Sequence, residues 1–160
     1  MSKNPAVDKA STVLSEDMDK STTTFVAVAK NTEPEPTASD AKVEASGTYQ
    51  WRLFRDGKQL GYLGVDCNSW AKIVSQEHAL PIESFPHNGV VYYRVHGSDR
   101  YMSVSDRAYV GFYNWSGATG FTKVGNGFRS DYNHQDLSYD NKENDYLTCW
   151  NTYARLEVFK

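Results

Sequence analysis

Short runs of alternating apolar and polar residues fill positions 48–160, and one spacing of apolar positions occurs there three times. Counted from Met102, apolar or aromatic residues fall at offsets of 0, 2, 10, 19 and 22, and the same offsets counted from Leu63 and from Leu137 again meet only such residues. The full set is Leu63, Val65, Ile73, Ile82, Phe85, Met102, Val104, Phe112, Phe121, Val124, Leu137, Tyr139, Leu147, Leu156 and Phe159. Because roughly half or fewer of the residues of an average chain are apolar, this agreement indicates a threefold internal repeat.

Each repeat reads as four short strands separated by turn residues. In the first repeat Trp51 and Leu53 alternate with polar neighbours, which is typical of a half-buried strand. The Asp-Gly pair at 56–57 predicts a tight hairpin turn, and the Asn-Gly pair at 88–89 suits a turn with positive φ at the start of the second repeat. The pattern therefore predicts an all-β domain of about twelve strands. Three equivalent units with apolar faces would bury them by closing into a barrel, which also removes free sheet edges.

Composition divides the chain near residue 47. Residues 1–47 contain a single aromatic residue, Phe25, and all the others lie in 48–160. A segment with so little apolar surface cannot offset the entropy lost on ordering. We therefore expect a disordered, acidic, proline-containing tail and linker at 1–47 and a folded domain at 48–160. The expected repeats span 48–89, 90–127 and 128–160.

Charge and hydropathy exclude several classes of partner. The net charge of −3 lies entirely in the tail, because residues 48–160 carry equal numbers of acidic and basic side chains. A neutral domain lacks the basic surface of a nucleic-acid binder, and no apolar run approaches the roughly 18 residues of a membrane span. The N-terminus has no hydrophobic signal core, so we expect a cytoplasmic protein or one exported without a leader. Whether Cys67 and Cys149 pair stays open.

The second repeat resembles the repeat of the fascin and histactophilin group of β-trefoil proteins. That group opens with K/R-Y-L-S-x, followed by a V-x-L/F strand and an F-x-x-V/L strand. Here the matching residues are RYMSV at 100–104, VGF at 110–112 and FTKV at 121–124. The resemblance implies a β-trefoil over residues 48–160. It does not extend to the ricin-type lectins, the other large trefoil group, because their Gln-x-Trp signature is missing.

Aromatic and polar residues gather in two of the repeats in a way that favours a sugar site. An aromatic ring can stack on the apolar face of a pyranose while Asn and Asp bind its hydroxyls. The candidates are Asp106, Tyr109, Tyr113, Asn114 and Trp115 in the second repeat, and Asp140, Asn141, Asp145, Tyr146, Trp150 and Asn151 in the third. In the alternative interpretation Trp115 and Trp150, both at offset 13, plug the hairpin cap of the barrel.

Catalytic and metal-binding patterns are lacking. The four histidines are scattered without metal-ligand spacing, and no nucleophile-base pair is implied. We therefore expect a non-catalytic binding module without metal or cofactor, lectin-like, with a glycan or glycoprotein as partner. The alternatives are a fascin-like trefoil that engages actin or another protein, and a trefoil protease inhibitor that presents the loop at 76–86. Fold-level resemblance alone does not decide between them.

The repeat pattern makes a stability prediction. Phe112→Ala, at an offset-10 position of the best-formed repeat, should lower the free energy of unfolding by roughly 3–5 kcal/mol. Asp140→Ala, in a polar loop, should change it by no more than about 0.5 kcal/mol. Chemical denaturation of both variants measures this, and equal costs would contradict the assigned register.

Overall fold

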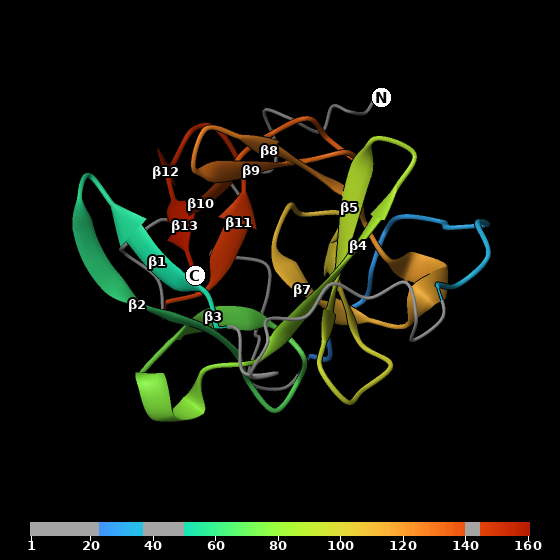
Figure 1. The fold of residues 1–160 in the computed structure, drawn as a ribbon, viewed down its shortest axis with the longest axis horizontal. Helices are drawn as coiled ribbons and strands as arrows, with labels where there is room; N and C mark the ends of the chain where they lie inside the picture. The colour runs from blue at the N-terminus through green and yellow to red at the C-terminus, as the bar shows by residue number, and fades with distance from the viewer. Residues whose placement is uncertain (1–22, 37–49, 140–144) are drawn as a thin grey trace.

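The fold was examined in a computed structural model, which describes residues 23–36, 50–139 and 145–160. It contains thirteen strands and two short 3-10 helices, and no α-helix occurs within these ranges (Figure 1). The elements are β1 (Arg52–Arg55), β2 (Lys58–Val65), β3 (Ala71–Val74), η2 (Gln76–His78), β4 (Ile82–His87), β5 (Val90–Val95), β6 (Tyr101–Val104), β7 (Val110–Tyr113), η3 (Trp115–Gly117), β8 (Phe121–Val124), β9 (Gly127–Ser130), β10 (Leu137–Tyr139), β11 (Leu147–Cys149), β12 (Ala154–Arg155) and β13 (Glu157–Phe159). The expected all-β class is confirmed.

Six strands follow one another in a ring. Three pairs of neighbouring strands form antiparallel ladders: β4 with β5, β8 with β9, and β13 with β1. Three further contacts join these ladders to one another. Gln50 and Pro81, which precede β1 and β4, form a β-bridge, and Val91 of β5 pairs with Phe121 of β8. The Val158 N–H of β13 donates a 2.7 Å hydrogen bond to the carbonyl of Asn126, which precedes β9. These six strands, which we call the outer strands, therefore form a closed ring.

The remaining strands form three hairpins, β2–β3, β6–β7 and β10–β11, which meet one another at equivalent points. Each hairpin is bridged to the next through the pairs Trp70 with Gly111, Tyr109 with Thr148, and Tyr146 with Lys72. Beside each bridge lies a residue with positive φ, namely Ser69, Ala108 and Asp145. The carbonyls of these three residues accept hydrogen bonds from the N–H groups of Phe112, Cys149 and Ile73, at 2.9, 2.8 and 2.9 Å. The three repeats are therefore joined in a cycle.

The third repeat is two residues longer than the sequence register assumes. Leu63 pairs with Ile73 and Met102 with Phe112, both ten residues on, whereas Leu137 pairs with Cys149, twelve residues on. The offsets assigned beyond Tyr139 are therefore wrong by two. The error was invisible in the sequence because side chains alternate along a strand, so a shift of two residues keeps the same face inward.

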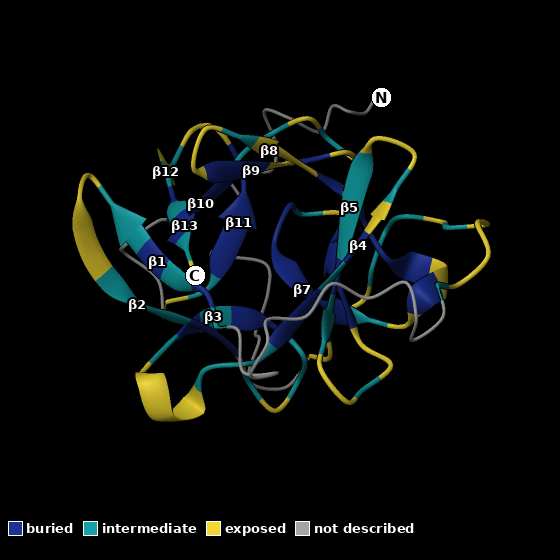
Figure 2. Ribbon diagram, in the orientation of Figure 1, coloured by how far each residue is buried: buried dark blue, intermediate teal, exposed yellow. Residues whose placement is uncertain are grey.

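Most of the repeat positions lie in the core. Twelve of the fifteen are buried, while Val65 is 37% exposed and Val124 and Phe159 are half-buried. Figure 2 shows β7, β9 and β11 largely buried and η2 exposed.

Three aromatic rings that the offsets did not include meet inside the barrel. Trp51, Tyr93 and Phe128 hold equivalent positions in the three repeats. Each is followed by an arginine, and that arginine pairs with the residue just before the start of the offset count, which is Leu63, Met102 or Leu137. Their ring centroids lie 4.8 Å apart for Trp51 and Tyr93, 4.8 Å for Trp51 and Phe128, and 5.3 Å for Tyr93 and Phe128. Each repeat thus contributes one ring to a shared cluster, which we call the aromatic triad.

Residues 23–36 differ from the expectation of a loose tail. They run along the first and second repeats and pass beside η3 (blue in Figure 1), and we call them the strap. Phe25 is 1% exposed and packs on Trp70, with ring centroids 5.1 Å apart. A composition argument misses this because a single aromatic side chain, placed in an existing socket, is enough to hold a polar segment. The rest of the expected tail, 1–22 and 37–47, lies outside the described residues, as do residues 48 and 49 of the expected domain.

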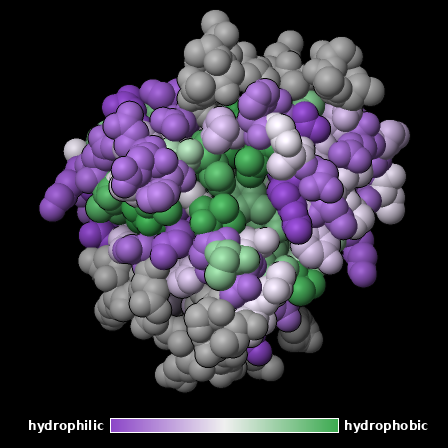
Figure 3. All heavy atoms as spheres, turned by 90° about the horizontal axis from the view of Figure 1, so that it is seen from below, coloured by the Kyte–Doolittle hydropathy of each residue, from purple (hydrophilic) through white to green (hydrophobic). Residues whose placement is uncertain are grey.

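The surface carries both apolar and hydrophilic residues. Seen from below, apolar residues gather in the centre of the face and hydrophilic ones surround them (Figure 3). Among the described residues, no helix has both the length and the apolar character needed to cross a bilayer.

The strap generates a prediction with a built-in control. Phe25 is buried whereas its neighbour Val26 is 60% exposed. Phe25→Ala should lower the free energy of unfolding by up to roughly 3–5 kcal/mol, and Val26→Ala should change it by about 0.5 kcal/mol or less. Thermal and urea melts of the full chain measure both, and equal effects would show that the strap is not docked through Phe25.

Candidate functional site

The residues proposed from the second repeat do not form an exposed platform. Tyr109 is 3% exposed and Trp115 is 9% exposed, while Tyr113 is half-buried. Only Asp106 and Asn114 lie at the surface. The expectation of open rings is wrong here because the strap covers them. The Trp115 indole N–H donates to the Glu33 carbonyl of the strap at 2.5 Å.

The candidates of the third repeat are equally occupied with internal contacts. Trp150 is 3% exposed, and the Tyr146 hydroxyl donates to an Asp66 carboxylate oxygen at 2.7 Å. Asp145 accepts from the Tyr139 hydroxyl at 2.7 Å, and the Asn151 side-chain oxygen accepts from the Asp136 N–H at 2.8 Å. Asp140 and Asn141 lie outside the described residues.

The two tryptophans are not equivalent, although both lie at offset 13. After the two-residue correction Trp150 corresponds to Tyr113, and it joins a cluster with Phe25 and Trp70. Trp115 belongs to a different cluster, with Phe85, Tyr101 and Ala118. Both indoles fill apolar clusters, which differ for the two residues.

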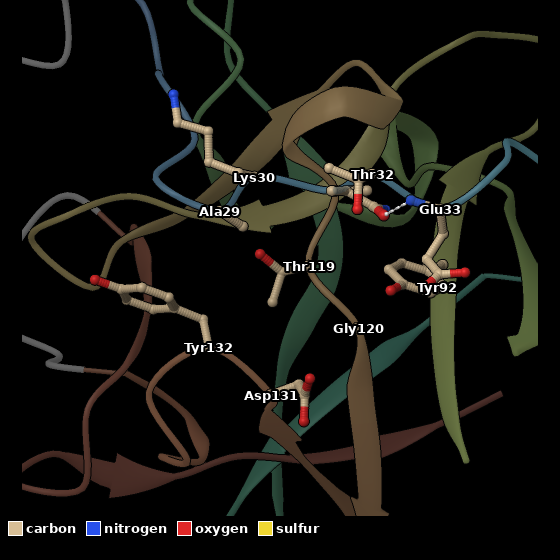
Figure 4. A pocket seen from close by; sticks show the side chains of 11 residues that line it. Ala29, Lys30, Thr32, Glu33, Tyr92, Thr119, Gly120, Asp131 and Tyr132 are labelled. Atoms are coloured by element: carbon tan, nitrogen blue, oxygen red, sulfur yellow. Dashed lines mark hydrogen bonds between the residues drawn. The ribbon is translucent and has the colours of Figure 1, made fainter. Parts of the chain in front are cut away.

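A cleft of about 410 Å³ opens between the strap and the barrel. One wall is the strap at 29–33, and the other comes from β5, the segment after η3 and the turn after β9. Figure 4 shows Tyr132 and Tyr92 at opposite ends of the cleft, with Thr119 between them and Asp131 across from Thr32. None of these barrel residues was among the sequence candidates.

Local structure explains how the barrel side of the cleft is held. The Asp131 N–H donates to the Gly120 carbonyl at 2.9 Å, which ties the turn after β9 to the segment after η3. The Tyr132 N–H donates to the Ser130 hydroxyl at 3.1 Å. Gly120 is required at this point because a Cβ there would lie 2.7 Å from a methyl group of Val90. These contacts fix Asp131 and Tyr132 on the rim.

Two polar atoms on residues that line the cleft lack a hydrogen-bond partner. They are the Thr119 hydroxyl oxygen and the Asn31 side-chain nitrogen, both buried. Thr119 is 2% exposed, and Figure 4 shows its hydroxyl directed toward the strap. A buried polar group without a partner costs roughly 1–3 kcal/mol. The cleft therefore holds unsatisfied hydrogen-bonding capacity that a polar ligand can meet.

The cleft also carries charges of both signs. Burial raises the pKa of Tyr92, and the carboxylates of Asp131 and Glu33 raise it further. The pKa of Tyr132 is raised by burial and then by Asp106. Both phenols thus keep their protons at neutral pH and can donate hydrogen bonds. Lys30 adds an ammonium group on the strap side.

The sequence held weak signals for this cleft. Asp131 and Tyr132 lie in a polar segment of six residues, DYNHQD. The strap was signalled only by Phe25, the lone aromatic residue of an otherwise polar segment. Nothing local could show that two segments about a hundred positions apart in the chain would face each other.

Metal binding has no support within the described ranges, where no group of three or more His, Cys, Asp and Glu residues gathers around one point. Cys67 is exposed and Cys149 is buried, and both are free thiols. Burial raises the pKa of Cys149, and Asp136 adds to this, so its thiol stays protonated.

Comparison with known protein families, characterised proteins and solved structures finds no match to this chain.

The strap contact at Tyr101 predicts a pH dependence. Burial, together with the 2.9 Å hydrogen bond from its hydroxyl to Glu35, raises the pKa of Tyr101 to about 12. In the unfolded chain a tyrosine ionises near its ordinary value of about 10. The stabilisation is thus fully present below pH 10 and is lost as the pH rises toward 12. Urea melts between pH 8 and 12 should show this fall, and Tyr101→Phe should make it shallower. An equal slope in both proteins would contradict the assignment.

Proposed function

We propose that this protein is a non-catalytic binding module of β-trefoil architecture, with its ligand site in the cleft beneath the strap. The cyclic bridges between three hairpins, and the ring of six outer strands, support the trefoil arrangement. The cleft is built from the strap, one residue of β5 and two segments that connect strands.

A carbohydrate is the ligand class that fits the cleft best. The observation that carries this proposal is Tyr132, whose side chain is 44% exposed at one end of the cleft and is one of the few large apolar or aromatic residues left open. An open ring can stack on the apolar face of a sugar, with a gain comparable to other ring contacts of roughly 0.5–1.5 kcal/mol. A volume of about 410 Å³ lies within the range of small-molecule sites.

Polar groups around the ring match the hydroxyls of a sugar. The Asp131 carboxylate accepts hydrogen bonds, the Lys30 ammonium donates them, and the unpartnered Thr119 hydroxyl can do either. Sugars present hydroxyls that both donate and accept, which suits this mixture of donors and acceptors. The site therefore differs from the two platforms expected from the sequence, while the ligand class is the same.

The proposal predicts how three rim substitutions change binding. In a glycan screen followed by titration calorimetry on the best hit, Tyr132→Ala should weaken binding roughly tenfold or more, which is about 1.4 kcal/mol. Tyr132→Phe keeps the ring and should retain most of the affinity. Asp131→Asn should weaken binding, while Asp99→Asn, at an exposed residue away from the cleft, should not.

The melting temperature of each variant serves as the control for folding. A glycan screen without any hit would overturn the carbohydrate assignment. Equal binding by the wild type and Tyr132→Ala would instead show that the sugar binds elsewhere on the molecule.

A further inference from the structure

The barrel holds the strap in the way that peptide-binding domains hold an extended ligand. Three strap N–H groups, each three residues from the next, donate to barrel carbonyls: Phe25 to Asn68 at 2.9 Å, Val28 to Val104 at 3.0 Å and Asn31 to Ser116 at 2.8 Å. At the two ends, the Trp70 indole N–H donates to the Thr23 carbonyl and the Trp115 indole N–H to the Glu33 carbonyl, both at 2.5 Å. Main-chain hydrogen bonds of this kind give affinity, and side-chain pockets add specificity.

The specificity pocket is the socket of Phe25. The phenyl ring packs edge-on against Trp70 and lies directly over Gly111, where an added Cβ would approach the ring carbons to 2.2 Å. The three atoms nearest to that Cβ all belong to Phe25. Gly111 thus provides the floor of the socket, and any larger residue there would exclude the ring.

Two polar contacts fix the far end of the strap. Glu33 lies 3.1 Å from His87, and Glu35 accepts from the Tyr101 hydroxyl at 2.9 Å. The strap therefore meets the barrel through an aromatic anchor, a row of main-chain bonds and an acidic end. All of these contacts are non-covalent.

The barrel core is complete without the strap. The main apolar cluster contains the aromatic triad and all the buried repeat positions except Phe85, and its buried members all lie between Trp51 and Val158. Phe25 belongs to a separate, smaller cluster. The strap is thus bound to the surface of a barrel whose own packing does not include it.

We propose that the strap groove is an interaction surface for a second copy of this chain, which docks its own residues 23–36 there when the resident strap is displaced. The strap of a second copy makes the same contacts without new strain, because its sequence is identical. The resident strap normally wins because attachment to the same chain gives it an effective concentration on the order of millimolar. Exchange of an identical element is a low-cost route to a dimer.

Two complementary variants of the full chain test this proposal. Phe25→Ala removes the anchor and keeps the socket, whereas Gly111→Ala fills the socket and keeps the anchor. Neither chain can dock its own strap well, so each alone should stay monomeric. An equimolar mixture should form a one-to-one heterodimer, measured by sedimentation velocity and native mass spectrometry. The control mixture replaces Phe25→Ala by Val26→Ala, whose resident strap still occupies its own socket.

The expected result is a heterodimer that is at least tenfold tighter in the Phe25→Ala mixture than in the control. Monomers only, or equal association in both mixtures, would overturn the proposal. Val28→Pro offers a second partner with a weakened resident strap, because it removes the N–H that bonds to Val104 while Phe25 is kept. If Phe25→Ala and Val28→Pro both abolish the cooperative melt, the strap is part of the folding unit and the proposal fails as well.

Discussion

The three rings of the aromatic triad are the contact on which the rest of the architecture depends. Tyr93 and Phe128 lie in the first strand of a repeat and Trp51 lies just before β1, and each ring touches the other two. A repeat with one apolar face cannot bury that face alone, so three of them must meet. The rings set the distance at which the outer strands close, and the bridges between the hairpins complete the cycle on the other side.

The strap gives this symmetric body a single distinctive face. It covers Trp70, Tyr109 and Trp115, which would otherwise expose large rings, and it supplies carbonyl partners for two indole N–H groups. The same segment forms one wall of the cleft that contains Asp131 and Tyr132. One short polar segment therefore both buries the rings that the sequence suggested for sugar binding and creates a different site beside them.

The fold class could be predicted from the sequence because strand periodicity is local and was repeated three times. The predicted repeat positions were less accurate where they depended on the length of a loop. Two extra residues between β10 and β11 shift every later offset, yet the alternation of strand side chains hides the shift, so Leu147 and Leu156 are buried even though they were assigned to the wrong positions. The expectation of exposed rings at the candidate site was wrong for another reason. Whether Trp115 is open or covered depends on a segment some eighty residues away, and the composition of that segment predicts no contact.

Gly111, which lies under Phe25, sets the number of straps that one chain can accept. A threefold scaffold offers three copies of every surface, but the positions equivalent to Gly111 are Lys72 and Thr148. Both carry side chains where the phenyl ring would lie, so one groove in three can accept a strap. Each chain then has one donor segment and one acceptor groove. Reciprocal exchange would satisfy both at once and end with two copies, whereas one-way exchange would leave a free strap and a free groove and continue as a linear chain. The geometry excludes branched networks, since those need a third contact on at least some members.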